Sequence, residues 1–122
     1  AQLGQPTEPL GWNLQDAHSL ALLRAGRIKD ARRENELLLR KLTLNLERGL
    51  VPNVNVNYRN GKRTQQSLRR EYLLHRALIE AVGEDKDKAR ELLTEVSGIE
   101  EAEVITKQQE PCIREIKSRI NP

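Results

Sequence analysis

Six basic residues in the middle of the chain have the type and spacing that could do chemistry. They are Arg59, Lys62, Arg63, Arg69, Arg70 and Arg76. An Arg guanidinium binds phosphate or carboxylate oxygens well because it presents two parallel N–H donors. The first three residues flank Asn60-Gly61, a dipeptide typical of reverse turns, so we expect them at an exposed tip. The set therefore predicts a binding surface for a polyanion, with contacts made mostly to phosphates if the partner is a nucleic acid.

The distribution of charge along the chain supports this prediction. Residues 24–76 hold 14 Lys and Arg against 5 Asp and Glu, although the formal net charge of the whole chain is only +3. A basic middle between acidic ends predicts a non-catalytic binding protein that docks on an anionic partner, nucleic acid first. The alternative is an adaptor or assembly subunit whose basic face meets an acidic protein surface or a second copy of the chain. A third interpretation is a solvated face whose charges serve only solubility or pair with the acidic C-terminal third.

A second basic group lies earlier in the chain and alternates with acids. It comprises Arg24, Arg27, Lys29, Arg32, Arg33, Arg40 and Lys41. Asp30, Glu34 and Glu36 fall between these residues, and Arg32 and Glu36 have the i,i+4 spacing of helical ion pairs. We therefore predict that this group forms a salt-bridged, exposed helix face.

Groups that could catalyse a reaction or bind a metal are few. The histidines are His18 and His75, and Cys112 is the one cysteine. Glu71 precedes His75 by four residues, so the two share a helix face, but no further ligand stands at a metal-binding spacing. The sequence therefore predicts no enzyme, no catalytic residue, no metal site and no cofactor.

The elements that must position these residues begin with a helical hairpin. Residues 1–12, rich in Pro and Gly, are predicted to be an irregular lead-in to a single compact domain over 13–122. Helices are predicted over 14–25 and from Arg27 onward, joined at Gly26. The segment 22–31 resembles the turn of a tetratricopeptide-type helical hairpin, in which a Gly precedes an Ala by five residues. No second copy recurs at that family's repeat spacing of about 34 residues, so the resemblance implies a hairpin and no repeat array.

The next segment changes its pattern. Leu42, Leu44 and Leu46 alternate with polar residues, and a similar alternation runs over 53–59. This alternation predicts two antiparallel strands, 41–47 and 53–59, joined by a turn at 50–53. The competing interpretation continues the second helix to Arg48 and makes 50–63 a loop.

The rest of the chain is mainly helical in its periodicity. Helices are predicted over 64–82, closed by Gly83, over 85–97, and over 111–120 with Pro111 in the first turn. A short strand is predicted near 102–106, with helix as the alternative. The expected fold class is therefore α+β, with about five helices and a central β-hairpin. A third short strand is optional.

Two further features bear on where the protein works. No apolar stretch approaches the roughly 18 residues of a membrane span, so we expect none. The chain begins at Ala1 and has no Met. Removal of a secretory signal would leave such a start, and so would a trimmed boundary. An exported protein would favour the adaptor over nucleic acid.

Overall fold

Helices α1 (Pro9–Arg24) and α2 (Ile28–Glu47) form a hairpin that turns at Gly26. Gly26 has a φ of +83°, a left-handed conformation that glycine adopts without a steric penalty. The Arg27 N–H donates to the Leu22 carbonyl (2.9 Å), which satisfies a carbonyl at the end of α1. The predicted helical hairpin is confirmed. Helix α1 starts before residue 14, however, and takes in the last four residues of the predicted lead-in.

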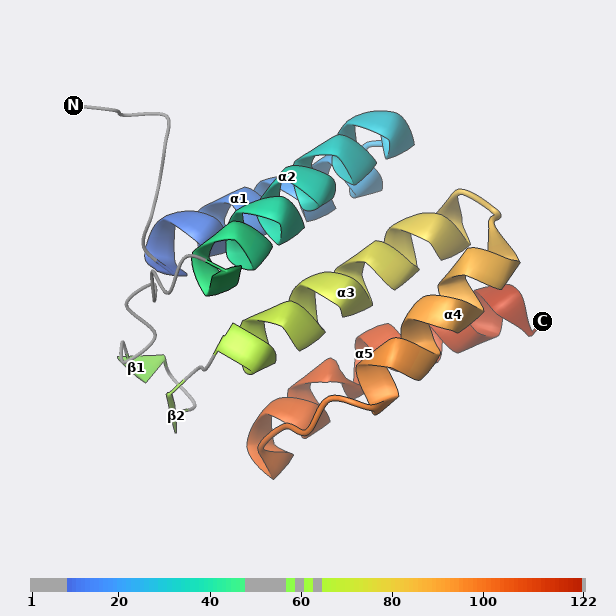
Figure 1. Cartoon of the computed structure of the whole chain (residues 1–122). Helices are drawn as coiled ribbons and strands as arrows, with labels where there is room; N and C mark the ends of the chain where they lie inside the picture. Colours follow the sequence, from blue (N-terminus) through green and yellow to red (C-terminus); the bar gives the residue numbers. More distant parts are fainter. Residues whose placement is uncertain (1–8, 48–56, 59–60, 63–64, 122) are drawn as a thin grey trace.

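A central helix, α3 (Gln65–Val82), lies between two helical pairs (Figure 1). The computed structural model describes residues 9–47, 57–58, 61–62 and 65–121. Helices α1 and α2 pack on one side of α3, and α4 (Lys86–Ser97) and α5 (Glu103–Ile120) pack on the other. The predicted helices over 64–82 and 85–97 are confirmed to within a residue at each end. No helix in these ranges is long and apolar enough to cross a membrane.

The core is aliphatic and centres on α3. Because α3 is covered on both sides, its buried residues include Leu73, Leu74, Ala77, Leu78 and Ile79, a broader apolar surface than a helix at the protein's edge would bury. A second buried cluster lies where α1, α2 and the start of α3 meet, and it consists of Trp12, Leu38, Leu42, Leu68 and Tyr72. Two of the three aromatic residues, Trp12 and Tyr72, therefore lie in the core.

The predicted α+β class with a central β-hairpin is wrong. Residues 41–47 are the last turns of α2, as the competing interpretation had it. Helical packing outweighs the period-2 pattern, because Leu42 continues the buried stripe of α2 while Leu44 is exposed. The Thr43 hydroxyl donates to the Leu39 carbonyl (3.0 Å), a bond typical of Thr within a helix.

A two-residue ladder is the only strand pairing in the described ranges. Asn57–Tyr58 (β1) pairs antiparallel with Gly61–Lys62 (β2), in the register Asn57 to Lys62 and Tyr58 to Gly61. Two residues on each side do not make a sheet that could carry part of the fold. The other residues of the predicted second strand, 53–56 and 59, lie outside the described residues.

Helix α5 corrects two further predictions. Residues 103–106 of the predicted strand and all of the predicted helix 111–120 belong to one helix, which continues through Pro111. Pro111 removes one backbone hydrogen bond, but the buried stripe of Ile105, Gln109, Ile116 and Ile120 continues across it. Packing of this stripe therefore keeps the helix continuous where the proline alone predicted a start.

In the turn between α3 and α4, the residue with a left-handed backbone is Glu84. It is not Gly83, the residue that was predicted to end α3. Glu84 has a φ of +68°, and the following Asp85 N–H donates to the Glu80 carbonyl (2.8 Å). Gly83 serves close packing instead, since an added Cβ there would lie 3.3 Å from Ile28 Cγ2. Asp85 then caps α4 through its carboxylate, which accepts from the Lys88 N–H (3.1 Å).

Candidate functional site

The predicted docking tip falls largely outside the described residues. Arg59 and Arg63 lie outside them, and Lys62 is described only as a backbone position in β2. The other three predicted docking residues, Arg69, Arg70 and Arg76, lie on α3.

Arg69 and Arg70 attach the start of α3 to the C-terminal pair of helices. Arg69 Nη2 lies 3.2 Å from Glu95 Oε2 in an exposed ion pair with α4. Arg70 is buried, and its Nε donates to the Val96 carbonyl (3.2 Å) while its Nη1 donates to Gln109 Oε1 on α5. The guanidinium of Arg70 therefore joins three helices and is directed into the protein.

Arg76 belongs to a charge network between α2 and α3. Its Nε donates to Glu80 Oε2 (2.6 Å) and its Nη2 to Glu36 Oε1 (2.9 Å). Arg32 completes the network, with Nε and Nη2 each donating to one oxygen of Glu80 at 2.9 Å. The expected pair of Arg32 with Glu36 is thus replaced by two pairs that cross between helices.

Glu80 is the centre of this network, and its side chain is only 4% exposed. Burial alone would raise the pKa of its carboxyl. The hydrogen bonds from Arg32 and Arg76 act in the opposite direction and together prevail, so the pKa of Glu80 lies below its ordinary value. A charged Glu80 is therefore the form that the fold stabilises.

The outward face of α2 carries basic residues of a different kind. Lys29, Arg33 and Arg40 are exposed, and within the described ranges none of the three has an ion-pair or hydrogen-bond partner. Leu37 and Leu44 lie among them and are 38% and 40% exposed. At about 100° per residue, all five fall within an arc of about 80°. Of the predicted salt-bridged face, the described ranges show only the pair of Arg27 with Asp30 within the group. Arg24 and Arg32 pair instead with Glu115 and Glu80 on other helices, while Lys29, Arg33 and Arg40 remain available.

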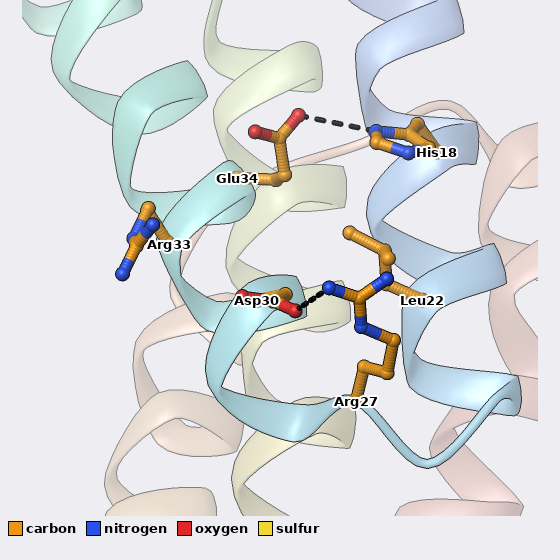
Figure 2. Close-up of a pocket in the computed structure, with 6 residues that line it drawn as sticks. All are labelled: His18, Leu22, Arg27, Asp30, Arg33 and Glu34. Carbon is orange, nitrogen blue, oxygen red and sulfur yellow. Dashed lines mark hydrogen bonds and ion pairs between the residues drawn. The ribbon is translucent and has the colours of Figure 1, made fainter.

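A groove of about 210 Å³ lies beside this face, between α1 and α2 (Figure 2). Two pairs of side chains line it: His18 Nδ1 lies 3.3 Å from Glu34 Oε1, and Arg27 Nη2 lies 2.5 Å from Asp30 Oδ2. Arg33 lies at the rim and takes no part in either pair. These four side chains are thus engaged with one another, and Arg33 extends the basic surface along the edge of the groove.

A separate polar cluster joins α1 to α3. His75 Nδ1 lies 2.9 Å from Oδ1 and 2.8 Å from Oδ2 of Asp16, and both side chains are mostly buried. Glu71, one turn before His75, places a carboxylate oxygen close to both residues. The sequence shows Glu71 and His75 on one face, but Asp16 is 59 residues from His75 and only the fold brings it there.

A cavity of about 290 Å³ between α1, α3 and α5 adjoins this cluster. Its lining includes His75 and Cys112, together with Arg24 and Glu115, which form a two-bond ion pair at 3.0 and 3.1 Å. Burial, together with the nearby charge of Glu115, raises the pKa of the Cys112 thiol to about 12. Cys112 is therefore a protonated thiol and a weak nucleophile.

Comparison with known proteins gives no assignment. No protein-family model, no curated protein and no solved structure matches this chain. The functional interpretation therefore depends on the residues described above.

Proposed function

We propose that this protein is a non-catalytic binding module that docks an acidic, amphipathic segment of a partner protein on the outward face of α2. The observation that carries the proposal is the position of Lys29, Arg33 and Arg40. They are exposed, lie on one face and have no partner within the described ranges. Cations that stabilised the fold would be paired, as Arg32 and Arg76 are.

The exposed leucines favour a protein partner over a nucleic acid. Leu37 and Leu44 lie between the cations, so a partner that covers this face would bury apolar surface as well as pair charges. Nucleic-acid surfaces that read single strands usually add aromatic platforms, and Trp12 and Tyr72 are fully buried. The adaptor hypothesis therefore has more support than the nucleic-acid hypothesis.

The shape of the face suggests the shape of its partner. Lys29 and Arg40 are eleven positions apart, or about 16 Å along the helix. A partner helix with acids on one face and leucines between them would match both the charges and the apolar positions. Arg59, Lys62 and Arg63 remain proposed contacts to the same partner, because they are basic and follow α2 in the chain.

The test is a titration with two probes, a labelled Glu- and Leu-rich amphipathic peptide and a labelled DNA oligonucleotide. We expect the wild-type chain to bind the peptide. Replacing Lys29, Arg33 and Arg40 together by Ser should weaken that binding about tenfold or more, as expected for the loss of three surface charge contacts of about 0.5 kcal/mol each. Binding should also weaken as salt is raised.

A control variant removes the same number of positive charges from another part of the surface. Lys88, Arg114 and Lys117 are exposed residues of α4 and α5. Replacing these three by Ser should leave peptide binding unchanged. Equal loss in both triple variants would show that only net charge matters, and binding of DNA without the peptide would restore the nucleic-acid hypothesis.

A further inference from the structure

The polar cluster between α1 and α3 has the composition of a metal site. The donor atoms of Asp16, Glu71 and His75 all lie within 4.8 Å of one another. Two carboxylates and one imidazole form a mixed oxygen and nitrogen set that suits first-row divalent cations, for which imidazole is a preferred ligand. This cluster is separate from the outward face of α2, so an inference from it does not depend on the proposed function.

The distances between His75 and Asp16 are close to those that one ion would require. Zn²⁺ binds His nitrogen and carboxylate oxygen at about 2.0–2.2 Å, so two of its ligands lie roughly 3 Å apart. The separations of 2.8 and 2.9 Å between His75 Nδ1 and the Asp16 oxygens are close to that value. An ion could therefore replace the hydrogen bond with little movement of either helix.

The burial of the cluster gives a second reason to expect a bound ion there. The Asp16 side chain is 4% exposed and that of His75 is 15% exposed, while Glu71 is partly buried. A divalent ion bound here would offset the negative charge of the two carboxylates in a place largely shielded from water.

We propose that Asp16, Glu71 and His75 bind one divalent transition-metal ion, with Zn²⁺ as the first candidate. The ion joins α1 to the middle of α3. Three protein ligands leave a coordination position of a tetrahedral ion for water or another small ligand. The cavity lined by His75 gives that position an approach; Cys112 lines the same cavity but does not belong to the group of three residues whose donor atoms lie within 4.8 Å of one another.

Titration with Zn²⁺ and with Co²⁺ alone tests the proposal. Trp12 lies one helical turn from Asp16 and is the one tryptophan, so its emission reports changes at the cluster. We expect saturation at one equivalent of Zn²⁺ and a rise in the melting temperature, since an ion that binds only the folded state stabilises it. Co²⁺ should give visible absorption of a nitrogen and oxygen site, without the near-ultraviolet band of a thiolate ligand.

Variants assign the ion to these residues. His75→Ala should abolish binding, and Glu71→Gln, which keeps size and leaves the Asp16–His75 contact in place, should weaken it about tenfold or more. His18→Ala is the matched control, because it removes the other histidine from an exposed carboxylate pair, and it should bind as wild type does. If Zn²⁺ fails to bind the folded wild-type chain, or if Glu71→Gln and His75→Ala bind it unchanged, the proposal is wrong and the cluster is an ion pair alone.

Discussion

Removing the charge at the centre of the α2–α3 network should cost much of the protein's stability. The variant is Glu80→Gln, which keeps the size of the side chain and one acceptor oxygen. In the wild type, Glu80 accepts two bonds from Arg32 and one from Arg76. The variant leaves Arg76 mostly buried beside a neutral amide, and among the described residues Glu36, which is half exposed, is then its remaining charged partner.

The size of the expected loss in unfolding free energy follows from the burial of the Glu80 and Arg76 side chains. Breaking a buried pair by removing one partner costs about 3–5 kcal/mol, because the remaining charge is left desolvated. Arg32 is about a third exposed and can regain water, so we expect the lower end of that range, about 3 kcal/mol. Such a loss is a large part of the roughly 5–15 kcal/mol that holds a typical domain together.

Urea unfolding at pH 7, monitored by circular dichroism, measures this loss. We expect a lower urea concentration at the midpoint and an unchanged dependence of the unfolding free energy on urea. The pH dependence gives a second measurement. Because the folded-state pKa of Glu80 is lowered, its contribution is fully present above the unfolded value, about 4.3, and is lost as the pH falls through the folded value. The difference between wild type and Glu80→Gln should therefore shrink as the pH falls below about 4.

The control is Arg69→Ala, which breaks the exposed pair with Glu95 and should change stability by less than about 1 kcal/mol. If Glu80→Gln unfolds within about 0.5 kcal/mol of wild type, the network contributes nothing to the fold. Arg76 would then regain its place as a candidate docking residue.

Three further predictions concern single residues. Arg70→Ala should destabilise the fold by about 2–3 kcal/mol in urea, because it leaves the buried Val96 and Gln109 oxygens without their donor; a neutral effect would show that the arginine is not structural. Glu84→Gly should raise the unfolding free energy by about 0.5–1 kcal/mol, since relief of a left-handed backbone outweighs the added freedom of the unfolded chain; destabilisation would contradict the assigned φ. The Cys112 thiol, with a pKa of about 12, should react with iodoacetamide far more slowly in the folded chain than in urea at pH 8, and equal rates would contradict its burial.

The sequence predicted those elements in which the apolar period and the end signals agree. Helix α3 has both, and its prediction is confirmed. In α2 the two signals disagree beyond residue 40, because leucines at every second position suggest a strand while Leu42 also continues the helical stripe. Packing against α3 decides the outcome, and such long-range packing is invisible in a local window.

The contacts of the site residues were likewise predictable from the sequence only in part. The pairing of Arg76 with Glu80 has an i,i+4 spacing and could have been found from the sequence. The contacts of Arg70 with Val96 and Gln109, and of Asp16 with His75, join residues 26 to 59 positions apart and depend on how α3 meets its neighbours. A cluster of basic residues in sequence therefore separates in space into cations that hold helices together and cations that face outward.

Two triple variants with the same change in charge test this separation most directly. One replaces Lys29, Arg33 and Arg40 by Ser, and the other replaces Arg69, Arg70 and Arg76 by Ser. In urea unfolding, the α2 variant should lose no more than about 1.5 kcal/mol, at about 0.5 kcal/mol for each exposed charge. The α3 variant should lose at least about 4 kcal/mol, because two of its residues hold buried contacts. Equal losses, or a larger loss in the α2 variant, would contradict the account.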